Sequence, residues 1–127
     1  QMAQIIREAP EGFSVYSGDD SLTLPLLAIG GAGIISVSSH VVGSEMKQMI
    51  EAFERGDVQT AAKMHQTLLP VFQALFAEPN PVPLKAVLNA KGIEVGEVRL
   101  PLVALQNEEA LNDVWNRWEK EKVQIFS

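Results

Sequence analysis

The 127-residue sequence contains no cysteine, so disulfides, thiolate nucleophiles and cysteine metal sites are all excluded. It also lacks a long hydrophobic run. The longest apolar stretch, Leu22 to Val37, is interrupted by one proline and three glycines and predicts no membrane span. The first residues, Gln1 to Gln4, show neither the basic nor the apolar part of a signal peptide. These features together predict a cytoplasmic protein.

Positive charge is scarce. Ten Lys and Arg residues stand against 16 Asp and Glu, which gives a formal net charge of −6. Proteins that bind nucleic-acid backbones concentrate Lys and Arg on one face, so nucleic acid is not expected as a partner. The hydrophobic share of 46% is ordinary for a globular domain.

The first part of the chain alternates helical and extended patterns. The apolar spacing predicts helices over residues 1–9, 22–29 and 44–55, and strands over Phe13–Ser17 and Ile34–Ser38. This order is typical of β/α units with a parallel sheet. Two strands cannot form a stable covered sheet by themselves. We therefore expect the last strands of a larger barrel, with the missing strands before Gln1.

After Gly56 the pattern becomes helical only. Helices are predicted over 58–76, with a kink at Pro70, over 84–91 and over 107–120. Between the first two, the proline-rich segment 78–83 predicts a stiff, extended connector. The sequence thus predicts two domains, β/α units in residues 1–56 and an all-helical domain in residues 57–127.

A glycine-rich run, Gly30-Gly31-Ala32-Gly33, invites comparison with dinucleotide-binding motifs. Those motifs follow a strand and open a helix, whereas this run follows a predicted helix and opens a strand. The glycines are better explained as the end of a helix and a tight turn into a buried strand.

Polar side chains follow both predicted strands. Asp19 and Asp20 come after the first, where they could transfer protons or bind a metal; alternatively, one caps the next helix and the other is solvated. His40 follows the second strand and is either an acid–base group or a loop residue. With no further acidic or histidine cluster nearby, no metal site is predicted. His65 lies on an apolar helix face, where a packed and hydrogen-bonded residue is expected.

Lysine is missing where a Schiff base would need it. Such a lysine has to be desolvated and directed at a carbonyl carbon, which places it on a strand inside a barrel. All six lysines lie on predicted helices or near helix ends, and no predicted strand contains one. They are Lys47, Lys63, Lys85, Lys91, Lys120 and Lys122. No catalytic residue is therefore predicted in this chain.

Four motifs, in this order, resemble the dihydrodipicolinate synthase family. The Tyr-Ser-Gly-Asp-Asp and Gly-Gly-Ala-Gly-Ile-Ile-Ser-Val segments, 16–20 and 30–37, are similar to its seventh and eighth strand regions. The segments 78–85 and 98–102 resemble its C-terminal helical region. The resemblance covers residues 1–115 and leaves the tail, from Trp115 onward, unmatched.

The resemblance implies the last units of a (β/α)₈ TIM barrel followed by a helical domain, usually in a homotetramer. It implies a lyase that condenses pyruvate with aspartate-4-semialdehyde in lysine (diaminopimelate) biosynthesis, without a metal or organic cofactor. Pyruvate would be held as a lysine Schiff base. By the same resemblance, Ile35 contacts pyruvate through its backbone, and Gly18 and Asp19 line the mouth of the site. The family's catalytic lysine, tyrosine and threonine–tyrosine relay lie upstream of this sequence.

Two alternatives remain at this stage. One is a non-catalytic assembly piece, either a natural split half or an engineered fragment. The other is a related aldolase of the same superfamily, acting on sialic acid or keto-deoxy sugars. The turn at residues 17–20 and the proline-rich connector favour the dihydrodipicolinate synthase interpretation.

Overall fold

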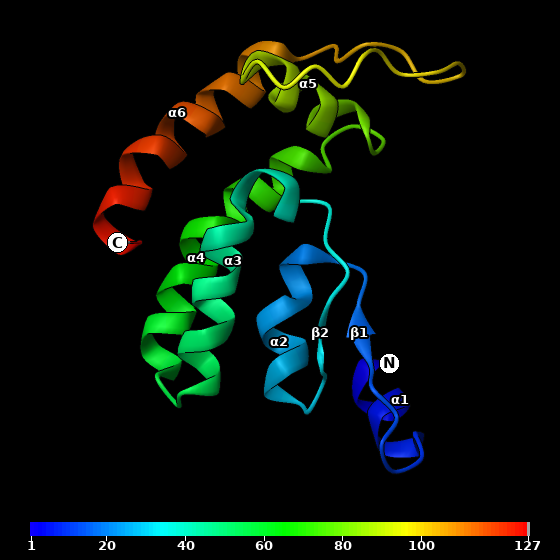
Figure 1. Cartoon of the computed structure of the whole chain (residues 1–127), viewed down its shortest axis with the longest axis vertical. Coiled ribbons are helices and arrows are strands. Elements are labelled where there is room, and N and C mark those ends of the chain that lie inside the picture. Colours follow the sequence, from blue (N-terminus) through cyan, green and yellow to red (C-terminus); the bar gives the residue numbers. More distant parts are fainter. Residues whose placement is uncertain (127) are drawn as a thin grey trace. The chain divides into compact units, whose positions relative to one another are not determined.

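The structure, a computed structural model, describes residues 1–126 of the chain (Figure 1). These residues form two compact units. Unit 1 is Gln1–Ser36, and unit 2 begins at Val37. Each unit has its own arrangement of elements.

Unit 1 is a β/α unit preceded by a short helix. Its elements are α1 (Met2–Glu8), β1 (Tyr16–Ser17), the 3₁₀ helix η1 (Asp20–Leu22), α2 (Thr23–Ala28) and β2 (Gly33–Ile34). The two strands are parallel, with Tyr16 opposite Gly33 and Ser17 opposite Ile34. The predicted parallel β/α arrangement is therefore confirmed for this pair of strands.

Both strands are shorter than predicted. β1 comprises the last two of the five predicted residues, and β2 ends at Ile34, where the prediction continued to Ser38. Alternating apolar side chains predict an extended segment, but a strand also requires a hydrogen-bonded neighbour. Within residues 1–126 each strand pairs only with the other, so the ladder is short.

The glycine-rich run forms the tight turn that was predicted from it. The Gly31 N–H donates to the Leu26 carbonyl at 2.9 Å and closes α2, while Gly30 takes a φ of +95°. A Cβ at Gly31 would lie 2.2 Å from Cγ of Leu26, a side chain with no exposed surface. Glycine is thus required at Gly31 for close packing and at Gly30 for backbone conformation.

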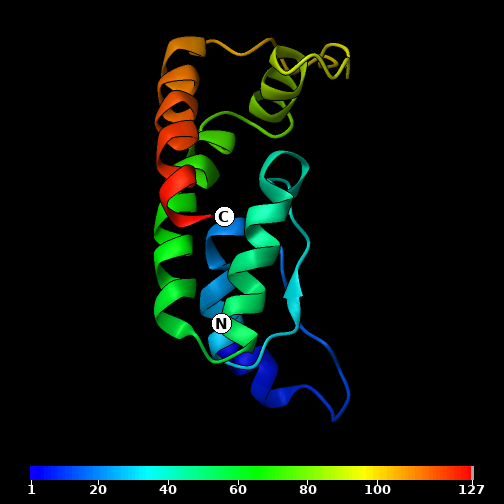
Figure 2. The ribbon, with the colours of Figure 1, turned by 60° about the vertical axis from the view of Figure 1, so that its left-hand side comes forward.

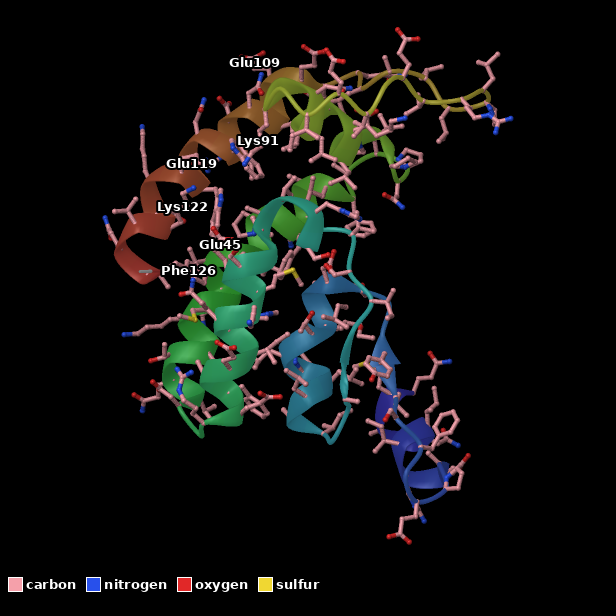
Figure 3. The ribbon with its side chains drawn as sticks, in the orientation of Figure 1. Glu45, Lys91, Glu109, Glu119, Lys122 and Phe126 are labelled. Atoms are coloured by element: carbon pink, nitrogen blue, oxygen red, sulfur yellow. The ribbon has the colours of Figure 1, made fainter. Side chains whose placement is uncertain are left out.

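Unit 2 is helical. It contains α3 (Ser39–Glu54), α4 (Val58–Leu75), α5 (Val82–Ala90) and α6 (Glu108–Ile125). The helix α4 packs against each of the other three, and Figure 2 shows α6 running alongside it. The helix α6 carries a partly buried ion pair between Lys122 and Glu119 (Figure 3). The core consists of one side of each helix, including Val42, Met46, Met49, Ala61, Leu68, Val71, Phe72, Leu75, Val87 and Leu111.

Local sequence explains where α4 begins and how α3 and α4 are joined. The Asp57 side chain accepts a hydrogen bond from the Thr60 N–H at 3.2 Å, which caps α4. Gly56, with a φ of +85°, ends the preceding helix, as its position in the sequence predicted.

The helix α4 continues through Pro70, as predicted, and ends at Leu75, one residue before the predicted end. Three other boundaries differ more from the predictions. The helix α3 begins five residues early, at Ser39, and has a non-helical residue at Val42. The connector is shorter, because α5 starts inside it at Val82, and α6 continues past residue 120 to Ile125. Pro83 falls at the start of α5, where a missing N–H removes no helical hydrogen bond.

The division into units falls after residue 36, so α3 groups with the later helices. The domain boundary at residue 56 refers to barrel units of a longer chain and stays a prediction. Ser127 lies outside the described residues. Between α5 and α6, residues 91–107 form an arm without helix or strand, which extends away from both helices in Figure 1.

Candidate functional site

The C-terminal edge of the β1–β2 pair brings the three predicted substrate-contacting residues together. Because the strands are parallel, both end at the same edge, where Gly18 and Asp19 follow β1 and Ile35 follows β2. The Ile35 N–H donates to the Ser17 carbonyl at 2.9 Å, which ties the two chain segments at this edge. In β/α barrels this is the edge at which active sites are built.

The turn after β1 is held by a network around Asp19. Its Oδ1 accepts hydrogen bonds from the N–H and the hydroxyl of Ser21, at 2.8 and 2.6 Å. Its own N–H donates to the Ser17 hydroxyl oxygen at 3.0 Å, and that hydroxyl donates to the Asp19 carbonyl at 2.9 Å. The predicted capping role therefore belongs to Asp19, which caps η1 while its side chain remains exposed.

Asp20 departs from the prediction. The expectation that the second carboxylate is solvated is wrong, because Asp20 is only 1% exposed. Its carbonyl accepts a hydrogen bond from the fully buried Thr23 hydroxyl at 2.8 Å. Asp20 and Thr23 are thus buried immediately after the exposed Asp19, and the pair of acidic residues is divided between surface and interior.

The edge itself is open. Ile35 is 71% exposed, and a Cβ added at Gly18 would meet no atom within 4 Å. Ile35 was predicted inside a strand, but it lies just beyond β2, held by its backbone hydrogen bond. At this edge a small molecule could contact the main chain, the carboxylate of Asp19 that caps η1, and the apolar side chain of Ile35. A wall of this composition can position a substrate but supplies no amine for a Schiff base.

Both histidines belong to unit 2. His40 is exposed in the first turn of α3. His65 is half-buried on α4, with its ring centroid 6.3 Å from that of Phe72, and burial lowers the pKa of its imidazole. The predicted packing of His65 is confirmed. The predicted hydrogen bond is not found at Nδ1, which has no partner among the described residues.

Within residues 1–126, neither of the two strands carries a lysine. In the same residues no group of three or more His, Asp or Glu side chains could hold a metal ion. No helix in that range has the length and apolar content needed to cross a bilayer.

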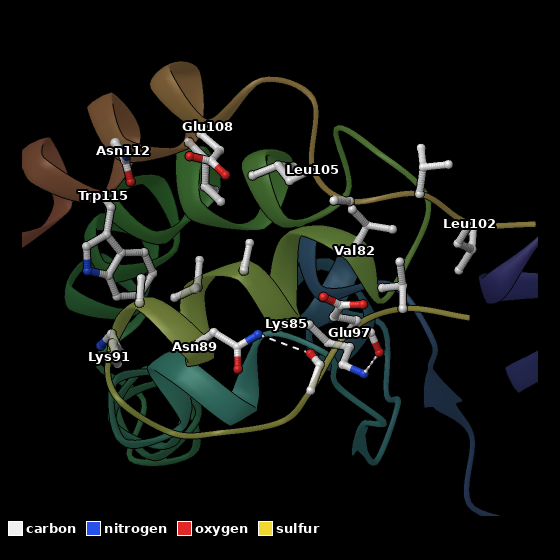
Figure 4. Close-up of a pocket in the computed structure, with 18 of the residues that line it drawn as sticks. Val82, Lys85, Asn89, Lys91, Glu97, Leu102, Leu105, Glu108, Asn112 and Trp115 are labelled. Atoms are coloured by element: carbon white, nitrogen blue, oxygen red, sulfur yellow. Dashed lines mark hydrogen bonds between the residues drawn. The ribbon is translucent and has the colours of Figure 1, made fainter. Parts of the chain in front are cut away.

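Unit 2 contains a cavity that sequence reasoning missed. It measures about 760 Å³ and lies between α5, the arm and the first half of α6 (Figure 4). The Lys91 ammonium sits 4.3 Å from the centre of the Trp115 ring at one end. The wall is formed by three consecutive segments between residues 82 and 115 that come together only on folding, so no single local pattern predicts the cavity.

Polar side chains along this cavity fasten the arm to α5. Lys85 donates to the Glu97 carbonyl. The Asn89 amide donates to the Gly96 carbonyl at 3.1 Å and accepts from the Val95 N–H at 3.0 Å. These side chains are engaged in structure, and the remaining wall is largely apolar. The cavity therefore has fewer available polar groups than its composition suggests.

A parallel β/α unit followed by a helical unit, with an open wall at the carboxyl edge of its strands, is what the end of a β/α-barrel enzyme would present. The model of the Dihydrodipicolinate synthetase family matches residues 1–115. The chain belongs to this family. The resemblance found in its four motifs is thereby confirmed.

Named relatives agree with this assignment. The 4-hydroxy-tetrahydrodipicolinate synthase of Listeria welshimeri is 63% identical over 108 residues, which are 85% of this chain and 37% of the relative. The solved enzyme of the same name from Methylacidiphilum fumariolicum SolV superposes with a TM-score of 0.93 at 36% identity, covering 98% of this chain and 42% of its own. A lysine-bound enzyme from Cyanidioschyzon merolae gives 0.89 at 42% identity, covering 94% and 41%. The chain thus spans about two fifths of the relatives it matches, and its solved relatives are TIM-barrel enzymes.

Proposed function

We propose that this chain is the C-terminal portion of a Schiff-base lyase that condenses pyruvate with aspartate-4-semialdehyde in lysine (diaminopimelate) biosynthesis. Family membership and the activity named for a relative at 63% identity support this assignment. In this proposal residues 1–56 are the last β/α units of a (β/α)₈ barrel, and residues 57–127 form its helical domain. The lysine that binds pyruvate belongs to the portion of the enzyme outside this chain.

The observation that carries the proposal is the convergence of Gly18, Asp19 and Ile35 at one edge. In the proposed enzyme the backbone of Ile35 contacts pyruvate, and Gly18 leaves room for close approach to the main chain. Asp19 lines the mouth, with its orientation set by two hydrogen bonds from Ser21. This chain then orients the substrate, and the covalent chemistry occurs on a lysine elsewhere.

The proposal includes a cytoplasmic homotetramer that needs no metal or organic cofactor. Subunit number requires its own measurement, because one similar solved structure is described as a monomeric dihydrodipicolinate synthase variant. Native mass spectrometry of the complete enzyme would give that number independently of activity.

A covalent hybrid tests the function directly. The matched region of the Listeria welshimeri enzyme, together with the residues that follow it, is replaced by the 127 residues of this sequence. We expect the hybrid to consume pyruvate and aspartate-4-semialdehyde. With pyruvate and borohydride it should gain one pyruvyl adduct, located by peptide mapping on a lysine of the Listeria portion.

The free 127-residue chain, treated in parallel, should gain no such adduct, because a Schiff-base lysine has to be desolvated and positioned. A stoichiometric adduct on the free chain would contradict this division of the site. A hybrid that forms the adduct but condenses pyruvate only with sugar aldehydes would instead identify one of the related aldolases.

A further inference from the structure

The cavity in unit 2 has the size and the walls of a small-molecule site. Ligand pockets in proteins usually measure about 300–1,000 Å³ and are mostly apolar, with a few polar groups that orient the ligand. This cavity measures about 760 Å³, and its walls are formed by α5, the arm and the first half of α6. Two apolar side chains of the arm that line it, Leu100 and Val103, are 87% and 53% exposed. Apolar surface is therefore available to a ligand.

The arm that forms one wall of the cavity is fastened near both of its ends. Near its start, the Asn89 side chain forms two hydrogen bonds with backbone groups of the arm. Near its end, the Glu78 carboxylate accepts hydrogen bonds from the N–H groups of Gln106 and Asn107, at 3.0 and 3.2 Å. The walls are thus in place before a ligand arrives, which lowers the entropic cost of binding.

One end of the cavity carries a positive charge. The Lys91 ammonium lies 4.3 Å from the centre of the Trp115 ring, and Figure 4 shows the two side chains together at this end. Among residues 1–126 no carboxylate forms an ion pair with this ammonium. Asn112 precedes Trp115 by three residues on the same side of α6 and also lines the cavity. A carboxylate bound here could therefore accept hydrogen bonds from an ammonium and an amide.

The other charged side chains of the cavity favour a ligand with a single carboxylate. Glu97 and Glu108 line the same cavity, and Figure 4 places Glu97 beside Lys85, away from Lys91. Lys85 already donates to the Glu97 carbonyl. A second carboxylate on the ligand would meet these glutamates, and like charges repel. Because the whole sequence has a net charge of −6, binding of an anion depends on the local charge of Lys91.

We propose that this cavity is a binding site for a small aromatic monocarboxylate. The ligand carboxylate pairs with the Lys91 ammonium, and the Asn112 amide donates a further hydrogen bond to it. The ligand ring contacts Trp115 and the apolar wall, since aromatic pairs are stabilised beyond the area that they bury. The site belongs to unit 2 alone, and the proposal does not rest on the proposed function.

Titration of the 127-residue chain with cinnamate, followed by amide NMR, tests the site. Cinnamate is an aromatic monocarboxylate, cinnamamide is its neutral counterpart of nearly the same shape, and para-carboxycinnamate adds a second carboxylate. We expect a Kd of roughly 0.1–1 mM for cinnamate, as for other ligands of its size, and at least about threefold weaker binding of the other two. The shifted amides should lie within residues 82–115. No binding of cinnamate, or equal binding of the three probes, would overturn the proposal.

Two pairs of variants locate the ligand. Lys91→Gln should weaken cinnamate about three- to tenfold and leave cinnamamide unchanged, which also shows that the cavity is intact. Lys120→Gln makes the same change on α6 outside the cavity lining and should affect neither probe. Ala90→Phe fills part of the cavity and should weaken both probes, whereas Ala110→Phe, at an exposed helical alanine outside the lining, should not. Equal effects within either pair would contradict this assignment.

The covalent hybrid with the Listeria welshimeri enzyme tests the site in the context of a longer chain. Saturation-transfer NMR compares cinnamate binding to the hybrid and to its Lys91→Gln form. Binding that depends on Lys91 in the hybrid supports the proposal. If cinnamate binds the free chain but not the hybrid, another segment of the enzyme fills the cavity and the proposal is wrong. The readout is binding, so its outcome is independent of whether the hybrid has lyase activity.

Discussion

Replacing Trp118 by alanine should cost unit 2 about 3–5 kcal/mol of unfolding free energy, the usual range for removing a large buried aromatic side chain. Trp118 lies in the second half of α6, is 3% exposed and belongs to the helix that packs along α4. It also lies beyond residue 115, where the match to the family ends. The prediction therefore measures how much this part of the chain contributes to the helical unit.

A second variant separates the ring–ring contact from the rest of this unfolding free energy. The Trp118 and Phe126 rings meet edge-to-face, with centroids 5.5 Å apart and planes inclined at 62°. Such pairs contribute about 0.5–1.5 kcal/mol beyond the area they bury. Phe126→Leu keeps most of the apolar volume and removes the ring contact, so it should cost roughly that smaller amount.

Urea unfolding monitored by far-UV circular dichroism provides the measurement, since fluorescence would lose one of its two tryptophan reporters. Val123→Ala is the matched control on the same helix: its side chain is 74% exposed, and the change should stay within about 0.5 kcal/mol. The reasoning is refuted if the unfolding free energy of Trp118→Ala lies within about 1 kcal/mol of the parent's value while its dependence on urea concentration is unchanged. That dependence reports the surface exposed on unfolding.

Three further predictions follow from the local geometry. Gly31→Ala should destabilise the protein by about 1–3 kcal/mol or more through overpacking. Gly43→Ala lies inside α3, and its Cβ would meet its nearest atom at 3.7 Å, so this change should be neutral or stabilising. Urea titration measures both variants. The side-chain hydrogen bond with Thr60 lowers the pKa of Asp57 below 3.8. The charged Asp57 carboxylate therefore stabilises the folded protein fully above that pH, and this contribution is lost as the pH falls through the depressed pKa. Asp57→Asn should reduce this acid dependence of stability. In the free chain Ile35→Val should change stability by less than about 0.5 kcal/mol, because the side chain is exposed, whereas Ile35→Pro removes its N–H bond to β1 and should speed amide exchange there.

The parts of the fold that sequence predicted well are those determined by nearby residues. Helical periodicity placed α4 and α6 within a few residues of their starts, since an apolar stripe and an acidic or amide N-cap are local signals. The turn at Gly30 and Gly31 followed from the conformations that only glycine adopts easily.

The errors have a common physical cause, which is tertiary contact. Asp20 is buried beside Thr23, whose hydroxyl donates to its carbonyl, whereas its neighbour Asp19 has the same side chain in an exposed position. The cavity beside Trp115 is formed by three segments that meet only after folding. Neither feature leaves a pattern within a short stretch of sequence.

In the proposed function this chain carries recognisable motifs, while the covalent chemistry is assigned to the rest of the enzyme. At the edge of β1 and β2, individual residues of this chain determine the shape of the backbone. Gly18 leaves space at the mouth, Asp19 fixes the turn, and Gly31 permits the approach of α2. Each of these roles depends on an individual residue at a fixed spacing, so the motifs can be recognised in a chain that spans only about two fifths of its relatives. A nucleophile, by contrast, acquires its reactivity from surroundings supplied by many segments, so the proposed function assigns positioning residues to this chain and the covalent step to the rest of the barrel.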